Sequence, residues 1–130
     1  MTSLMRPLSL VAAALLLAGC ESDGASFIID PPARALSVVR HKPYPGAPWQ
    51  LAAVIRNDPD CQRKHRMKDV GGNTRVELYQ PAPGAWILNQ GKRWYVVELK
   101  SCGFEQFKEE PQQPGEPVGT FLVRDGRFVF

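Results

Sequence analysis

Short runs of apolar residues, rich in β-branched and aromatic side chains, recur from Ala35 onward and are separated by proline, glycine, asparagine and aspartate. This pattern predicts β-strands joined by turns. Alternate positions in the segment 49–56 should point to opposite faces of a strand. In the segment 75–80, apolar and polar residues alternate strictly, which predicts a strand with Val76 and Leu78 in the core and the other face in water.

Turn residues predict two hairpins. One hairpin joins the segments 85–88 and 93–100 through a polar turn that contains a glycine. The second joins 119–123 to 128–130 through an Asp-Gly pair at 125–126. An Asp-Gly pair favours a type I′ turn, whose twist matches that of the flanking strands. The chain is therefore expected to end inside a strand.

Two further features are expected in the interior. The unbroken apolar run 94–97 predicts a central strand that is covered on both faces. The terminal Phe130 is expected in the core, because five or six short strands are too few for a spanning outer-membrane barrel of at least eight.

The segment 58–70 fits two interpretations. Asp58 is a suitable helix cap and Pro59 suits the first helical position, and no helix breaker follows until Gly71 and Gly72. A short helix and a polar loop fit this composition equally well. We expect a mainly β fold, a single small antiparallel sheet or incomplete barrel of five or six strands, with an α+β fold as the alternative.

The N-terminus has the three parts of an export signal. Arg6 provides a positive flank, the segment 8–17 is apolar, and Leu17, Ala18 and Gly19 precede Cys20. This start resembles that of bacterial lipoprotein precursors. The resemblance implies that residues 1–19 are a signal peptide that is removed, and that Cys20 carries covalent lipid at the new N-terminus. From Pro7 to Gly19 the chain is too short to cross a bilayer, which requires about 20 apolar residues.

The motif Leu17-Ala18-Gly19-Cys20, which we call the lipobox, is followed by two expected parts of the mature chain. Residues 20–33 are expected to be the lipidated cysteine and a tether, and residues 34–130 a single disulfide-stapled β domain. The apolar residues 27–29 fit an edge strand docked on the domain as well as a loose tether. Glu21 follows the cysteine at the sorting position of lipoproteins, and the resemblance then favours the outer membrane, with the domain in the periplasm.

Lipidation of Cys20 leaves two cysteines, Cys61 and Cys102, in a compartment that permits disulfides. We expect these two to be bonded. The alternative is a copper or zinc carrier that uses Cys61, His65, Met67 and Cys102, although none of the usual paired ligand spacings is present. The only cofactor expected is the covalent lipid on Cys20.

The formal net charge of +3 is too small to indicate nucleic-acid binding. The densest positive cluster is expected either to contact an anionic partner or to lie solvated in a turn. It consists of Arg63, Lys64, Arg66 and Lys68. In the second case four glutamates brought near by the disulfide would neutralise it. These are Glu105, Glu109, Glu110 and Glu116.

The sequence lacks the local signals of an enzyme. Neither Ser37 nor Ser101 lies in a glycine elbow, and His41 and His65 lie in polar sequence. We therefore expect a non-catalytic envelope accessory or binding module, held at the membrane by its anchor and partnered by an envelope protein or polymer. The alternative is an inhibitor of a cell-wall hydrolase that places the basic residues 63–68, as a loop tip, in an acidic cleft.

Overall fold

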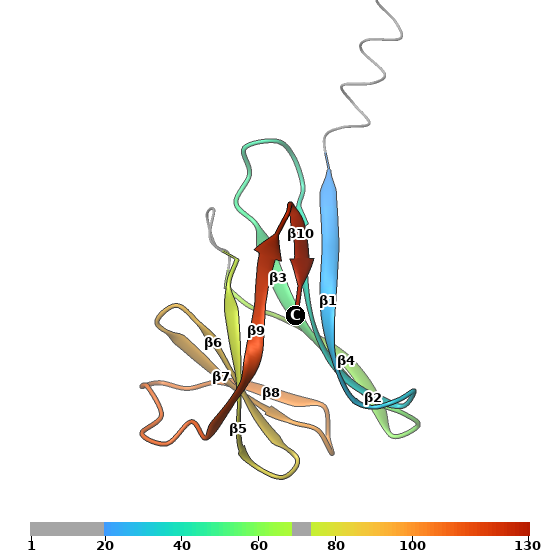
Figure 1. The fold of residues 1–130 in the computed structure, drawn as a ribbon, viewed down its shortest axis with the longest axis vertical. Helices are drawn as coiled ribbons and strands as arrows, with labels where there is room; N and C mark the ends of the chain where they lie inside the picture. Colours follow the sequence, from blue (N-terminus) through green and yellow to red (C-terminus); the bar gives the residue numbers. More distant parts are fainter. Residues whose placement is uncertain (1–19, 69–73) are drawn as a thin grey trace, which may run out of the picture.

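The computed structural model describes residues 20–68 and 74–130. Ten strands occur there and no helix, and the strands form two antiparallel sheets (Figure 1). The strands are β1 (Glu21–Asp30), β2 (Arg34–Lys42), β3 (Gln50–Asn57), β4 (Cys61–Arg66), β5 (Val76–Ala82), β6 (Ala85–Gln90), β7 (Arg93–Glu98), β8 (Gly103–Gln106), β9 (Glu116–Arg124) and β10 (Arg127–Val129). The first sheet has the order β1-β2-β3-β4, and the second β10-β9-β5-β6-β7-β8. The mainly β, antiparallel prediction is confirmed, but the strands are ten in two sheets rather than five or six in one.

The core lies where the inward faces of the two sheets meet. The predicted alternation in the segment 49–56 is confirmed, since Leu51, Ala53 and Ile55 of β3 are at most 1% exposed. Val76 and Leu78 of β5 are fully buried, as their pattern predicted. Because alternate residues of a strand share a face, β2, β3, β5, β6 and β7 each supply two or three buried residues to this core, and β9 and β10 supply one each.

Both predicted hairpins are confirmed. β6 pairs with β7 from Ala85 opposite Glu98 to Gln90 opposite Arg93. β9 pairs with β10 around Asp125 and Gly126, whose φ angles of 52° and 78° are both positive. Two successive positive φ angles are the requirement of a type I′ turn, which aspartate and glycine tolerate.

Both interpretations of the segment 58–70 are wrong for residues 61–66. Residues 61–66 form β4, which pairs with β3 from Arg66 opposite Ala52 to Cys61 opposite Asn57. Residues 69 and 70 lie outside the described residues. The local capping signals favoured a helix, but pairing with β3 and the attachment of Cys61 to the second sheet override a weak local preference.

The tether interpretation is wrong for residues 21–30, and the alternative of a docked edge strand at residues 27–29 is confirmed. Residues 21–30 form β1, which pairs with β2 from Glu21 opposite Lys42 to Asp30 opposite Arg34. The phenyl ring of Phe27 packs on Trp86, with 5.3 Å between ring centroids. β1 is therefore part of the domain, and the domain begins next to Cys20 rather than at residue 34.

Two expectations about burial need correction. The run 94–97 is covered on one face only, because Tyr95 and Val97 are buried whereas Trp94 and Val96 are half-buried. β7 lies next to the edge strand β8 rather than at the centre of its sheet. Phe130 is 40% exposed, although its ring contacts those of Phe27 and Phe121.

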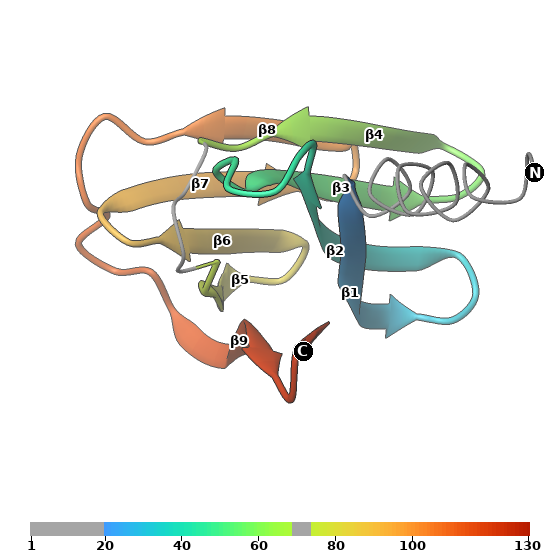
Figure 2. The same ribbon diagram turned by 90° about the horizontal axis from the view of Figure 1, so that it is seen from above.

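The two sheets meet along two edges, which we call seams (Figure 2). The disulfide seam joins β4 to the turn just before β8 through the Cys61–Cys102 bond. At the same seam Asn57 Nδ2 donates a hydrogen bond to the carbonyl oxygen of Leu99, at 3.2 Å. Both contacts link the first sheet to the turn that precedes β8.

The Asp23 seam joins β1 and β2 to β10. The Asp23 carboxylate of β1 pairs with the Arg40 guanidinium and accepts a hydrogen bond from the Phe128 backbone N–H at 3.1 Å. The guanidinium carbon of Arg40 lies 4.2 Å from the ring centroid of Trp49 and 5.4 Å from that of Phe128. A charged group, rather than a covalent bond, therefore holds this edge.

No helix of a length and hydrophobicity that would cross a membrane occurs in residues 20–68 and 74–130. The predicted signal peptide, residues 1–19, lies outside the described residues.

Candidate functional site

Cys20 is exposed and has a free thiol directly before β1. Its Sγ lies 3.8 Å from Nδ1 of His41, which stands opposite Ser22 in the β1–β2 pairing. The residue expected to carry lipid is therefore accessible and lies at the end of the first sheet. Lipidation itself stays a prediction.

The Cys61–Cys102 disulfide is present, with an S–S distance of 2.00 Å and a Cα–Cα distance of 6.0 Å. The other two residues of the metal-carrier hypothesis also have structural partners. His65 Nε2 donates a hydrogen bond to the Cys102 carbonyl oxygen at 2.8 Å, and Met67 is 3% exposed in the core. In this bonded form the two cysteines provide no thiolate for a metal ion.

The four residues of the predicted basic cluster do not form one patch. Because β4 is a strand, Lys64 and Arg66 lie on one face of the sheet and Arg63 on the other. The register places Arg63 opposite the buried Ile55, so Arg63 lies at the edge of the core-facing side. Lys68 follows the strand. The loop tip on which the inhibitor hypothesis relied is thus a strand.

The expected glutamates do not neutralise Arg63 or Lys64 in the described part of the chain. No ion pair joins Arg63 or Lys64 to any of the four glutamates of residues 105–116 there. The disulfide therefore does not bring Arg63 or Lys64 into an ion pair with these glutamates of the described chain.

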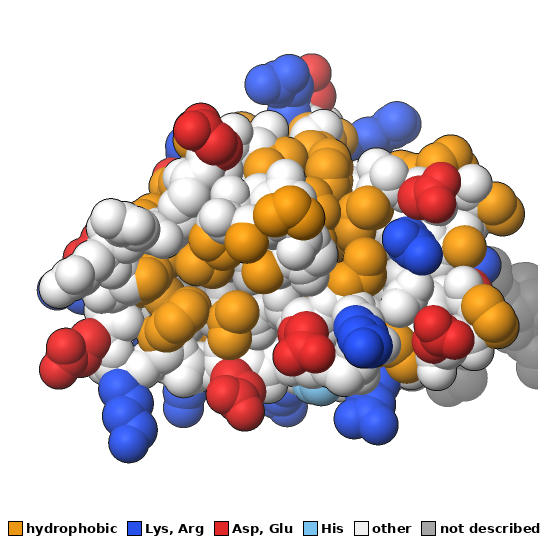
Figure 3. Space-filling model, turned by 90° about the horizontal axis from the view of Figure 1, so that it is seen from below, with side chains coloured by type: hydrophobic (Ala, Val, Ile, Leu, Met, Phe, Trp, Pro, Cys, Tyr) orange, Lys and Arg blue, Asp and Glu red, His pale blue; other side chains and the backbone are white. Residues whose placement is uncertain are grey.

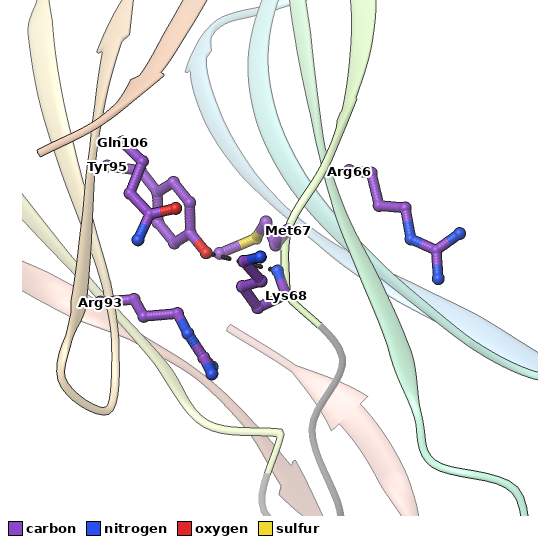
Figure 4. A pocket seen from close by; sticks show the side chains of 6 residues that line it. All are labelled: Arg66, Met67, Lys68, Arg93, Tyr95 and Gln106. Carbon is purple, nitrogen blue, oxygen red and sulfur yellow. Dashed lines mark hydrogen bonds between the residues drawn. The ribbon is translucent and has the colours of Figure 1, made fainter.

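Two cationic side chains, Lys68 just after β4 and Arg93 of β7, lie instead at an open hollow of about 540 Å³, which we call hollow 1 (Figure 4). Its described lining residues are Arg66, Met67, Lys68, Arg93, Tyr95 and Gln106. In Figure 4 Arg93 extends from β7 toward Lys68, with Tyr95 and Gln106 beside them, whereas Arg66 lies across the β4 backbone. Lys68 and Arg93 therefore form the centre of the site.

A buried hydrogen-bond network fixes the backbone at Lys68. The Lys68 N–H donates to the Tyr95 hydroxyl at 3.3 Å, and that hydroxyl donates to Gln90 Oε1 at 3.1 Å. Gln90, which is 3% exposed, returns a bond from Nε2 to the Lys68 carbonyl oxygen at 2.8 Å. The backbone of Lys68 is thereby held against β6 and β7 although its side chain is exposed.

An aromatic stack supports Tyr95 from the other side. The Tyr95 ring lies 4.9 Å from the ring of Phe104, which lies 5.1 Å from the imidazole of His65. The stack connects β7, β8 and β4, and His65 is bonded to Cys102. Hollow 1 is thus connected to the disulfide seam through Tyr95, Phe104 and His65.

Hollow 1 has the chemistry of an anion-binding site. Its described lining combines cations and an amide and contains neither carboxylate nor imidazole, and the Tyr95 hydroxyl is hydrogen-bonded on both sides. Sequence reasoning predicted Lys68 and Arg66 but missed Arg93. The local signal for Arg93 was the basic pair Lys92-Arg93 at the hairpin turn. This pair indicates an anion site only when the fold brings β7 next to Lys68.

A second hollow, of about 320 Å³, lies on the outer face of the first sheet. Lys64 and Arg66 form part of its rim, and Ala52 of β3 and Val39 of β2 continue the row from Arg66 across the sheet. Of the two cations on this rim, Lys64 belongs to the second hollow alone.

No family model matches this sequence, and neither the curated proteins nor the solved structures contain a significant match to the chain.

Proposed function

We propose that the protein is a lipid-anchored, non-catalytic binding module of the bacterial cell envelope, and that hollow 1 binds an acidic segment of an envelope partner. The lipobox at residues 17–20 supports the anchor, and Glu21 supports an outer-membrane location with the domain in the periplasm. The single observation that carries the binding function is the convergence of Lys68 and Arg93 on one open hollow.

The arrangement favours binding for two physical reasons. An anion in hollow 1 is attracted by both Lys68 and Arg93, because both line the hollow. The Lys68 backbone is held by the bonds to Tyr95 and Gln90, so less ordering is required when a partner binds.

The test uses the mature chain with Cys20→Ser and a fluorescent poly-glutamate peptide as a probe of acidic protein surfaces. We expect Lys68→Glu/Arg93→Glu to weaken binding by at least about tenfold, because two attractive charges become repulsive. The matched control is Arg34→Glu/Lys100→Glu, the same charge change at two exposed residues outside hollow 1. Equal weakening by both variants would show that only net charge matters and would refute the site.

The anchor is tested in cells. Wild-type protein should incorporate labelled palmitate and sediment with membranes, and Cys20→Ala should do neither while retaining its disulfide. A Cys20→Ala protein that stays in the membrane fraction after a high-salt wash, which removes proteins held by charge alone, would contradict the anchor and leave the poly-glutamate result unaffected.

A further inference from the structure

The absence of a spacer at Cys20 determines how an anchored domain meets the bilayer. β1 begins at Glu21, which pairs with Lys42, so a lipid on Cys20 would be attached one residue away from a folded sheet. Thirteen extended residues would have held the domain up to about 45 Å away. With β1 folded, the end of the domain that bears Cys20 lies at the headgroups instead.

Three segments of the domain meet at this end. The end of β2 and the β2–β3 loop, residues 42–49, lie beside Glu21 through the β1–β2 pairing. The bond from the Phe128 N–H to Asp23 places β10, and thus the turn 124–127, on the other side. Figure 1 shows the start of β1, this loop and this turn together at one end of the long axis.

We propose that the anchored domain rests on an anionic lipid leaflet through this end, by a surface formed by Lys42, Tyr44, Arg124 and Arg127, which we call the anchor-end surface. The proposal rests on the lipid anchor of the proposed function. It adds the orientation of the domain and the chemical class of the lipid.

Charge supports an anionic leaflet. Arg124 and Arg127 are exposed at the tip of the β9–β10 turn, and Lys42 is half-exposed. The acidic residues within the same segments are Glu21 and Asp125. The opposite end of the molecule differs, since acidic and basic side chains lie side by side there around apolar atoms (Figure 3). Basic residues near an anionic bilayer surface each contribute about 1 kcal/mol of attraction.

An aromatic residue on the same surface suits the interface. Tyr44 is 60% exposed in the proline-rich loop 43–48. A tyrosine ring combines an apolar body with a polar hydroxyl, and such rings are favoured at the level of the headgroups. The prolines of this loop lack N–H donors, so the loop does not pair as a strand. Tyr44 is therefore left exposed to solvent.

The test measures vesicle binding by the mature chain with Cys20→Ser, which carries no lipid. Vesicles are made of phosphatidylcholine alone or of equal parts phosphatidylcholine and phosphatidylglycerol, at low salt. We expect binding to the anionic vesicles only, and on the order of a twentyfold loss for Arg124→Glu/Arg127→Glu. Raising the salt should weaken the wild-type interaction, because exposed charges are screened.

Two controls make the result decisive. Arg34→Glu/Lys100→Glu makes the same charge change away from the anchor-end surface and should alter vesicle binding by less than about twofold. If circular dichroism shows that Arg124→Glu/Arg127→Glu is unfolded, Arg124→Gln/Arg127→Gln replaces it. This variant removes the two positive charges without adding negative ones, so its loss of vesicle binding should be smaller. Equal loss in the Arg34/Lys100 control, or no wild-type preference for anionic vesicles, overturns the proposal. Neither result would affect the test of the lipid anchor by palmitate labelling of Cys20 or the test of hollow 1 by peptide binding.

Discussion

The two seams close the same pair of sheets by different physical means. At the disulfide seam a covalent bond joins β4 to the second sheet, supported by His65 and the stacked ring of Phe104. At the Asp23 seam, one carboxylate binds a guanidinium and a backbone N–H. The first seam requires an oxidising compartment, whereas the second requires an ionised carboxylate.

The difference between the seams also separates the two proposed binding surfaces. Hollow 1 rests on the disulfide seam through Tyr95, and the anchor-end surface rests on the Asp23 seam through β10. A change at one seam should therefore disturb mainly one surface. Mutations that break each seam in turn test whether the two edges are independent.

The largest effect is expected from breaking the disulfide seam. The bond closes a separation of 41 residues, for which the chain-entropy model gives about 4 kcal/mol of stabilisation. Cys61→Ala/Cys102→Ala should lower the free energy of unfolding in urea by that order and weaken peptide binding at hollow 1. Vesicle binding by the folded fraction should persist.

Cys20→Ser is the control for the cysteine substitutions, because this thiol lies outside the seam. It should leave the unfolding curve unchanged and remain sensitive to a reducing agent. A wild-type protein whose unfolding curve is unaffected by reduction would show that the disulfide seam contributes no stability.

The next largest effect is expected at Arg40. Arg40→Met keeps an apolar stem beside Trp49 and Phe128 but leaves the Asp23 carboxylate without its cation. Asp23 is 35% exposed, so water relieves part of the penalty, and we expect a loss of about 2 kcal/mol in the free energy of unfolding. Urea unfolding measures it.

A double substitution distinguishes a lost ion pair from lost packing. Asp23→Asn/Arg40→Met removes the unpaired charge, so it should cost less than the sum of its two single substitutions. Strict additivity would contradict direct coupling between Asp23 and Arg40.

The two seams were unequally accessible to sequence reasoning. Cysteine parity predicted Cys61–Cys102 because, once Cys20 is assigned to lipid, only one pair remains. The Asp23 seam had no such signal, since Asp23 lies among charged and small residues that resemble a tether. Its partners Arg40 and Phe128 are 17 and 105 positions away, and only the assembled sheets bring them together.

The same distinction applies to the fold and the candidate site. Alternation in β5 and the Asp-Gly turn at 125–126 are local signals, and both predictions held. β4 failed because its strand depends on pairing with β3, which no local pattern records. Of the two central residues of hollow 1, the sequence predicted Lys68, because it belongs to the basic cluster at residues 63–68. It did not predict Arg93, which reaches the hollow from β7.

The smallest expected effect is a difference in how the two seams respond to acid. The hydrogen bond from Arg40 holds the pKa of Asp23 below its ordinary value of 3.8, although partial burial opposes this shift, and the Phe128 N–H adds to the lowering. A carboxylate with a lowered folded pKa adds stability above its unfolded pKa. This stability is lost as the pH falls through the folded pKa.

Urea unfolding from about pH 6 down to about pH 2.5 should therefore separate the seams. The difference in free energy between wild type and Asp23→Asn should shrink below about pH 4, because the wild-type carboxylate becomes protonated. The difference between wild type and Cys61→Ala/Cys102→Ala should stay constant, because a disulfide does not titrate. If both differences shrink in parallel, the acid response is a general loss of structure and Asp23 does not hold its seam by charge.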